Sequence, residues 1–161
     1  MIVLVMGVAG SGKTTIAKML ADSLGWEFSD ADSFHPPANV EKMSQGIPLE
    51  DADRAPWLQA LQATIERWLR EKKNVVLACS ALKAAYRERL CCDKSRMQLV
   101  YLKGSFELLQ SRLAQRSDHF MKQNLLQSQF DILEEPAEGI YVDILLPPKV
   151  IVQQIRVNLG L

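Results

Sequence analysis

Neither sign of charge is in excess in this sequence. Its 161 residues include 19 Lys and Arg and 19 Asp and Glu, so the formal net charge is zero. Proteins that bind nucleic acid or membrane surfaces usually carry a basic excess. We therefore expect no nucleic-acid partner and no membrane partner. Any cationic site must be local, built from a few placed Lys and Arg residues.

Long hydrophobic runs are also missing. No run approaches the roughly 20 apolar residues that span a bilayer. The apolar residues 1–6 have no basic segment before them and pass directly into a glycine-rich loop. We therefore expect no signal peptide there.

Cysteine is scarce. The three cysteines are Cys79, Cys91 and Cys92, and they form no CxxC pair and no Cys/His zinc pattern. The adjacent Cys91 and Cys92 are poorly placed to pair with each other. Reduced thiols without a role are typical of the cytoplasm, so we expect a cytoplasmic protein.

What the sequence does contain is an alternation of short apolar runs with helical patterns. Hydrophobic residues make up 48% of the chain, which is enough to bury one core, and the length suits one domain over residues 1–161. We predict strands at residues 2–6, 26–29, 74–79, 98–102 and 141–145. We predict helices at residues 13–24, 52–71, 83–90, 106–116 and 149–159.

This alternation predicts an α/β fold. Strands separated by helices pair in parallel, and right-handed crossovers cover both faces, giving a three-layer α/β/α sandwich on a five-stranded parallel sheet. Residues 30–55 and 117–139 fit the alternation poorly, because both are polar and contain Gly or Pro breakers. Ligands bind beyond the carboxyl ends of such strands. We therefore predict a substrate-binding insertion at 30–55 and a mobile lid at 117–139.

The segment after the first predicted strand matches GxxxxGK(S/T), the Walker A pattern. Glycines let the backbone wrap around a phosphate, and the helix that begins near Lys13 adds the positive end of its dipole. Lys13 reaches the β- and γ-phosphates of ATP, and the Thr14 hydroxyl is placed to bind Mg²⁺. The alternative is a glycine-rich turn that fits the pattern by chance. The predicted nucleotide contacts are Gly7, Val8, Ala9, Gly10, Ser11, Gly12, Lys13, Thr14 and Thr15.

A P-loop alone does not distinguish a kinase from a GTPase or a motor. No Asn-Lys-x-Asp guanine-reading motif is present. The third predicted strand runs into Ser80 without the acidic residue that Walker B proteins usually have there. The carboxylate on the magnesium side must therefore come from another segment, and the second strand offers one.

Asp30 and Asp32 follow that second strand. They alternate along an extended segment, so both can project toward the P-loop. Small-molecule kinases need one carboxylate to accept the proton of the attacking hydroxyl and another near the metal. We predict Asp32 for the first role and Asp30 for the second, although the pattern does not decide between them. The alternative is a polar turn with two solvated carboxylates, and His35 beside it is either structural or a substrate contact.

Basic residues occur where the predicted sheet ends. Arg54 begins a helix among acidic residues, where it forms either a surface salt bridge or a fork for a substrate carboxylate. Lys83 and Arg87 follow the third strand at the carboxyl edge of the sheet, which is the catalytic side. All three are candidate substrate contacts.

Arginines also precede the predicted lid. Arg112 and Arg116 lie four residues apart and share a helix face, and His119 follows. A lid needs arginines to neutralise the transferring phosphoryl group and apolar residues to exclude water. We predict nucleotide contacts for both arginines and a catalytic role for Arg116. The alternative is an amphipathic helix pair with solvated arginines.

Taken together, these motifs resemble the gluconokinases of the small P-loop type, relatives of shikimate and nucleoside monophosphate kinases. The match runs nearly the whole chain. Besides the Walker A loop it includes Asp30-x-Asp32-x-x-His35-Pro36, Asn39-x-x-Lys42-Met43, Gly46-x-Pro48-Leu49-x-Asp51-x-Asp53-Arg54-x-Pro56-Trp57-Leu58 and Cys79-Ser80-Ala81-Leu82-Lys83. It continues through Tyr86-Arg87, Tyr101-Leu102-Lys103-Gly104, His119-Phe120-Met121 and Leu126-x-Ser128-Gln129-Phe130-x-x-Leu133-Glu134-x-Pro136.

The resemblance implies ATP-dependent phosphorylation of D-gluconate at O6 by a cytoplasmic homodimer. With this substrate, we predict Arg54 and Arg87 at the gluconate carboxylate. We predict His119 as a further substrate contact, close to Arg112 and Arg116. Two positions depart from the family pattern: Ala9, where Ser is common, and Ala31, where Gly is common. The first change is mild, since the loop works through backbone N–H groups.

Two rivals remain open. One is another small kinase, for shikimate or a nucleoside monophosphate, which the segment from Asp51 to Leu58 argues against. The other is a nucleotide-binding module without transfer activity, which the paired carboxylates and the lid arginines argue against.

Overall fold

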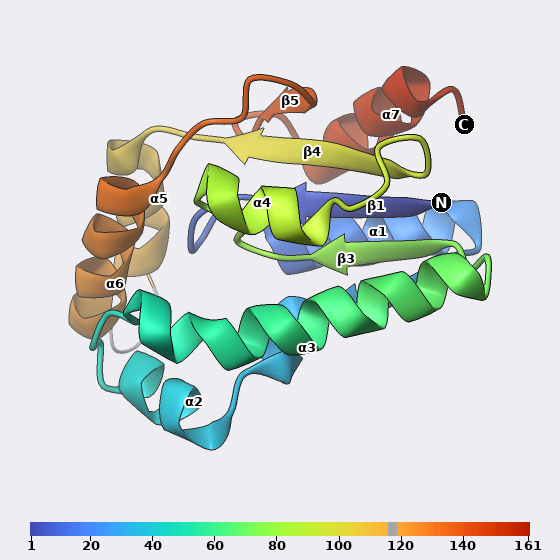
Figure 1. Ribbon diagram of the computed structural model, residues 1–161. Helices are drawn as coiled ribbons and strands as arrows, with labels where there is room; N and C mark the ends of the chain where they lie inside the picture. The colour runs from blue at the N-terminus through green and yellow to red at the C-terminus, as the bar shows by residue number, and fades with distance from the viewer. Residues whose placement is uncertain (116–118) are drawn as a thin grey trace.

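The computed structural model describes the backbone of residues 1–115 and 119–161. It describes the side chains of residues 1–115 and 126–161. Figure 1 shows the arrangement of its helices and strands. The strands are β1 (Ile2–Met6), β2 (Glu27–Asp30), β3 (Val75–Ala78), β4 (Met97–Lys103) and β5 (Ile140–Asp143). The helices are α1 (Lys13–Leu24), α2 (Pro37–Ser44), α3 (Asp51–Arg70), α4 (Ala84–Leu90), α5 (Phe106–Ala114), α6 (His119–Ile132) and α7 (Pro148–Leu159), and a 3₁₀ turn, η1, spans Ala31–Phe34.

The five strands form one parallel sheet in the order β2-β3-β1-β4-β5. β1 is central and all its residues are buried. Its side chains alternate between two apolar clusters: Val3 and Val5 face one, and Ile2, Leu4 and Met6 face the other. A continuous apolar run is therefore what this position demands, because both faces of the strand are covered.

Helices cover both faces of the sheet. α1 and α7 supply Ile16, Leu20 and Ile155 to the cluster that contains Val5. α3 and α4 supply Trp57, Leu61, Ile65 and Leu90 to the cluster that contains Leu4. In Figure 1, α3 and α4 lie in front of the sheet and α1 and α7 behind it. The predicted three-layer α/β/α architecture is confirmed.

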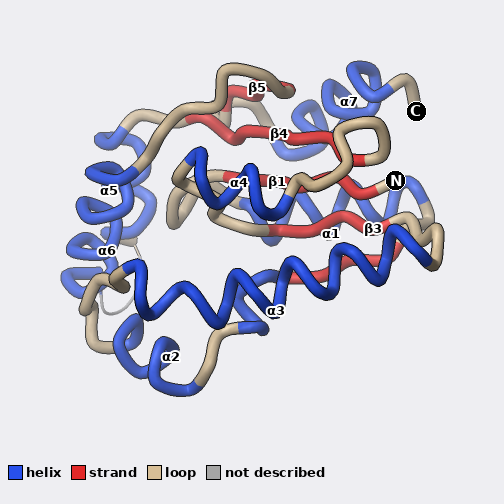
Figure 2. The backbone as a smooth tube through the Cα atoms, viewed as in Figure 1, coloured by secondary structure: helices blue, strands red, loops and turns tan. Residues whose placement is uncertain are grey.

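The carboxyl ends of the strands all point to the same end of the molecule. The strand arrows in Figure 1 point toward α5 and α6, while both chain termini lie at the opposite end. Figure 2 shows the loops after β1 and β3 turning at that end. The phosphate-loop segment, the turn after β2 and the segment after β3 therefore converge there.

The predicted strand 2–6 and helix 13–24 match β1 and α1, and the other predicted boundaries differ from the observed ones by at most two residues. β2, for example, is Glu27–Asp30 where residues 26–29 were predicted. The sequence patterns did not reveal α2 and α6, which lie in the two regions that fit the alternation poorly. Among the described residues, no helix is long and apolar enough to cross a membrane.

Candidate active site

The P-loop begins where β1 ends. Gly10 and Gly12 have φ values of 80° and 92°, a region that residues with a Cβ rarely adopt. A Cβ at Gly7 would lie 2.5 Å from the buried Ser11 Oγ, so the loop closes on itself only with glycine there. The loop has the tight curvature that the Walker A pattern predicts. Because Gly12, Lys13 and Thr14 also line a cavity, the N-terminus of α1 lies at that cavity.

Lys13 lies against its own loop. Its Nζ donates a hydrogen bond to the Val8 carbonyl oxygen at 3.1 Å. Loss of hydration lowers the pKa of Lys13, and the charges of Asp32, Cys79 and Asp30 oppose that shift. A poorly hydrated ammonium interacts strongly with an incoming anion. Lys13 is therefore suited to exchange the Val8 carbonyl for a phosphate oxygen.

Thr14 and Asp30 meet across the two strand ends. The Thr14 hydroxyl donates to Asp30 Oδ2 at 3.0 Å, and Asp30 Oδ1 accepts the Asp32 backbone N–H at 2.9 Å. These are the hard oxygen atoms that Mg²⁺ prefers, and Mg²⁺ is usually held by few protein ligands plus phosphates and water. The described part of the chain has no cluster of three or more His, Cys, Asp or Glu that could hold a metal on its own. The donor set thus fits a magnesium ion carried by a nucleotide.

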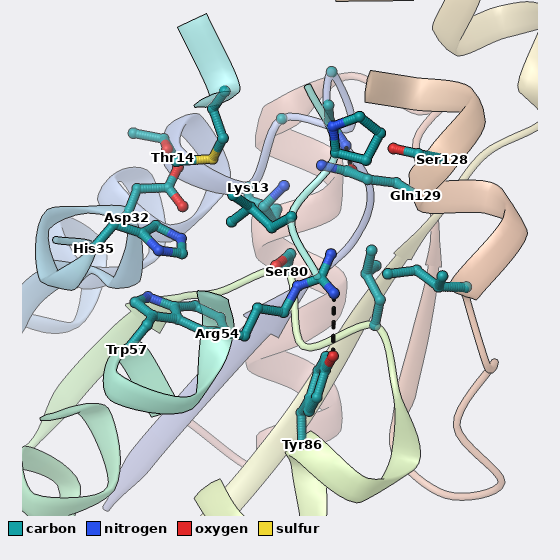
Figure 3. Close-up of a pocket in the computed structure, with 18 of the residues that line it drawn as sticks. Lys13, Thr14, Asp32, His35, Arg54, Trp57, Ser80, Tyr86, Ser128 and Gln129 are labelled. Carbon is teal, nitrogen blue, oxygen red and sulfur yellow. Dashed lines mark hydrogen bonds between the residues drawn. The ribbon is translucent and has the colours of Figure 1, made fainter. Parts of the chain in front are cut away.

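A cavity of about 390 Å³ joins the P-loop to the rest of the site (Figure 3). Two sets of lining residues matter most, and we name them the P-loop wall and the α3 wall. The P-loop wall is Ala9, Gly10, Gly12, Lys13, Thr14 and Thr15. The α3 wall is Asp32, His35, Arg54, Trp57 and Tyr86. Further lining residues come from the α2–α3 segment, from β3–α4 and from α6: Met43, Pro48, Leu49, Ser80, Leu82, Ser128, Gln129 and Ile132.

Among the described residues that line the cavity, Asp32 is the one carboxylate. Its side chain still reaches solvent, but the surrounding protein removes much of its hydration. That burial raises the pKa of Asp32, the Asp30 charge adds to the rise, and Lys13 and His35 oppose it. A carboxylate with a raised pKa is a stronger base, which suits proton acceptance from a hydroxyl group.

Arg54 projects from the first turns of α3 into the cavity and is held in place from α4. Its Nη1 donates to the Tyr86 hydroxyl at 3.2 Å, the contact drawn in Figure 3. The Tyr86 hydroxyl in turn donates to Asp51 Oδ1 at 2.6 Å, and Lys83 Nζ donates to the same oxygen at 2.9 Å. The Arg54 side chain is 15% exposed. A guanidinium oriented in this way keeps donors free for a carboxylate.

Other predicted contacts lie away from the cavity. Arg87 is buried, and its guanidinium donates to the backbone oxygens of Ala81 (2.7 Å), Leu82 (3.1 Å) and Glu134 (2.7 Å). Burial lowers the pKa of Arg87. Arg87 therefore links the β3–α4 segment to the α6–β5 segment through hydrogen bonds, and it does not line the cavity.

Lys83 and Arg112 are also engaged elsewhere. Lys83 forms its ion pair with Asp51, and Arg112 Nη2 donates to the Ile144 carbonyl oxygen at 2.8 Å. Neither residue lines the cavity. Arg116 lies outside the described residues, and so does the side chain of His119.

Several cavity residues were not predicted as site residues. Trp57 stacks on His35, and Tyr86 orients Arg54. Gln129 Oε1, from α6, accepts the Ala9 backbone N–H at 2.6 Å, so α6 touches the P-loop. All three lie in motifs that carried the family resemblance, at Trp57-Leu58, Tyr86-Arg87 and Ser128-Gln129-Phe130. Their presence in these motifs is the sequence signal that could have identified them as site residues.

Comparison with known proteins agrees with this geometry. A family model described as shikimate kinase matches residues 9–144. A gluconokinase from Gluconobacter oxydans is 51% identical over 138 residues, which cover 83% of this chain and 75% of that protein. A probable gluconokinase from Xenopus tropicalis is 45% identical over 174 residues, covering 97% and 92%.

A solved structure is similar over nearly the whole chain. The crystal structure of a gluconokinase from Sinorhizobium meliloti 1021 superposes with a TM-score of 0.86 at 41% identity, covering 98% of this chain and 90% of that one. Fold and sequence thus point to the same group of proteins.

Proposed function

The chain belongs to the gluconokinases, within the shikimate kinase family, and from this premise we propose that it transfers the γ-phosphoryl group of ATP to O6 of D-gluconate. The products are 6-phosphogluconate and ADP. The observation that carries the proposal is the shared cavity, in which a P-loop wall suited to phosphates meets an α3 wall with one arginine and one basic carboxylate. Gluconate offers a carboxylate and a row of hydroxyls, which match these two groups.

In this proposal, different residues bind the phosphates, bind the gluconate carboxylate and accept the proton. The P-loop amides and Lys13 bind the β- and γ-phosphates and stabilise the charge that grows on them during transfer. Arg54 binds the gluconate carboxylate. Asp32 accepts the proton of the O6 hydroxyl while the O6–phosphorus bond forms and the bond to the β-phosphate oxygen breaks.

Magnesium belongs to this proposal. Thr14 would ligate the ion directly, and Asp30, 3.0 Å from the Thr14 hydroxyl, would orient a water molecule bound to it. When bound, the ion neutralises phosphate charge. Asp30 then takes the role of the carboxylate that β3 lacks.

We also propose that residues 30–55 form the substrate-binding insertion and 117–139 the lid of one domain spanning 1–161. The contact between Gln129 and the Ala9 N–H supports the lid, because it links α6 to a P-loop amide that a phosphate would use. Arg116 would contact the nucleotide, with Arg112 and His119 near it. Hydrogen exchange across 117–139 should slow when ATP and gluconate are both bound. Equal exchange with and without the ligands would contradict the lid.

Cytoplasmic location and a homodimer complete the proposal. All three cysteines are free, which suits a reducing compartment. Val150 and Val157 are exposed on α7, and Leu145 lies exposed just before it, which offers apolar surface to a second copy. Analytical ultracentrifugation tests the dimer, since a purely monomeric protein at micromolar concentration would contradict it.

The substrate is tested by measuring ADP release with gluconate, shikimate, AMP and a panel of related polyhydroxy acids. We expect gluconate to give the highest kcat/KM. The family model is described as shikimate kinase, so shikimate is the informative rival. Preference for shikimate or AMP would overturn the proposal, and ATP binding without any transfer would favour a nucleotide-binding module.

A further inference from the structure

His35 is held rigidly at the cavity by its neighbours. Its imidazole stacks on the Trp57 ring, with centroids 4.6 Å apart and planes 9° from parallel. Both side chains are labelled in Figure 3. Trp57 is itself fixed, because its buried Nε1–H donates to the Ala31 carbonyl oxygen at 2.8 Å. The stack sets the plane of the imidazole but leaves open which ring nitrogen carries the proton.

Asn39 decides the proton position. Asn39 is 2% exposed, and its Nδ2 lies 2.7 Å from the Asp53 carbonyl oxygen and 3.1 Å from His35 Nδ1. An atom 2.7 Å from a carbonyl oxygen must be a donor, so the amide nitrogen and not the amide oxygen occupies this place. The opposite amide orientation would set two oxygen atoms against each other. The hydrogen that remains on Nδ2 then points at His35 Nδ1.

An amide nitrogen donates and does not accept, so His35 Nδ1 has to be the acceptor. In a neutral imidazole the proton is then on Nε2. Burial lowers the pKa of His35, and the Arg54 charge lowers it further against the opposing effect of Asp32, so the neutral form is the relevant one. Asn39 was not among the predicted site residues and does not line the cavity.

We propose that Asn39 is a positioning residue that holds His35 as the Nε2–H tautomer, so that His35 donates a hydrogen bond to an oxygen atom of the sugar acid. The ligand in this statement rests on the proposed function, whereas the tautomer does not. His35 and Arg54 are then both donors on the α3 wall, and Asp32 is its acceptor. A His35 fixed in this way does not compete with Asp32 for the hydroxyl proton.

The direct test is the ¹⁵N spectrum of the imidazoles in the free protein at neutral pH. The chain has two histidines, so the His35→Gln variant assigns the signals of His35. We expect a protonated Nε2 and an unprotonated Nδ1 in wild type. A protonated Nδ1 in wild type would overturn the proposal, whatever the substrate assays show.

Asn39→Asp tests the cause. A carboxylate at this position accepts from Nδ1, so we expect the His35 proton to appear on Nδ1. The gluconate KM should rise about tenfold, comparable to the loss of one hydrogen bond, with the ATP KM unchanged. Asn158→Asp is the matched control, because it makes the same substitution at an exposed position on α7, away from the cavity, and should change neither the spectrum nor the KM. An unchanged His35 tautomer in folded Asn39→Asp would contradict the role of Asn39.

A second pair of variants keeps the test decisive if Asn39→Asp does not fold. His35→Gln retains a donor near the Nε2 position, and His35→Leu has none. We expect the gluconate KM of the Leu variant to exceed that of the Gln variant about tenfold. Equal values would contradict the donor role. If the Nε2–H tautomer is present but no sugar acid is phosphorylated, the proposed function fails and the assignment to Asn39 stands.

Discussion

The P-loop wall and the α3 wall border the same cavity, yet the chain builds them in different ways. The P-loop wall comes from one continuous stretch of the chain, residues 9–15, whose shape depends on the positive φ angles of Gly10 and Gly12. The α3 wall gathers side chains from three separate segments, and the Arg54–Tyr86 hydrogen bond links residues 32 positions apart. In the proposed function, local backbone geometry would bind the phosphates, and long-range packing would select the acceptor.

The largest effect should come from the P-loop wall. Lys13→Ala should lower kcat by about 10² to 10³, because a preorganised charge on the transferring phosphoryl group is lost. Steady-state kinetics measure the loss, and gluconate binding by calorimetry should change little. Circular dichroism should show an intact fold, since the ammonium is outside the apolar clusters. Near-normal turnover would contradict the assignment of phosphate binding to the P-loop wall.

Asp32→Asn should lower kcat by about 10²-fold, because the shape of the α3 wall is kept while the base is removed. The raised pKa of Asp32 adds a pH signature. Below that pKa the carboxyl is protonated and cannot accept a proton, so wild-type kcat/KM should fall on the acid side at a higher pH than an ordinary aspartate predicts. The variant should lack this acid limb. ATP binding, measured separately, should survive.

Arg54→Ala should raise the gluconate KM by about 10- to 100-fold and leave the ATP KM nearly unchanged, because a charge-assisted contact to one substrate is lost. Tyr86→Phe is the matched control. It keeps the guanidinium but removes its 3.2 Å hydrogen bond, so its effect on the gluconate KM should be smaller. If only the ATP KM changed, Arg54 would contact the nucleotide and not gluconate, and its assignment to the α3 wall as a substrate contact would be wrong.

Arg87→Met should have the smallest effect on activity. Arg87 donates to three backbone oxygens and does not line the cavity, so its loss should reduce the free energy of unfolding by about 1–3 kcal/mol. Denaturant unfolding measures this change, and the gluconate KM of the folded variant should stay close to the wild-type value. A large rise in that KM without loss of stability would instead support Arg87 as a substrate contact, which is what the sequence predicts.

The elements that the sequence did not predict share one physical property. α2 buries a single residue, Asn39, so it has no apolar stripe to give a helical period. In α6, which lies in the segment predicted as a lid, eight of the fourteen residues are polar. Both helices are positioned by contacts to other segments, such as Lys42 to Asp53 and Gln129 to Ala9.

The sequence by itself determined the parallel sheet and the P-loop. Short continuous apolar runs such as Val75–Ala78, alternating with helical patterns, predict strands covered on both faces, and the glycine spacing of the loop predicts its tight curvature. The tertiary structure alone decided which arginine faces the cavity. Arg54 and Arg87 are equally plausible in sequence, but packing leaves the Arg54 guanidinium beside the Tyr86 hydroxyl in the cavity and buries that of Arg87 against three carbonyl oxygens. The same holds for His35, whose proton depends on Asn39 and, through it, on the backbone of α3. A backbone turn is encoded by neighbours in the chain, whereas a side chain takes its role from the groups that folding brings to it.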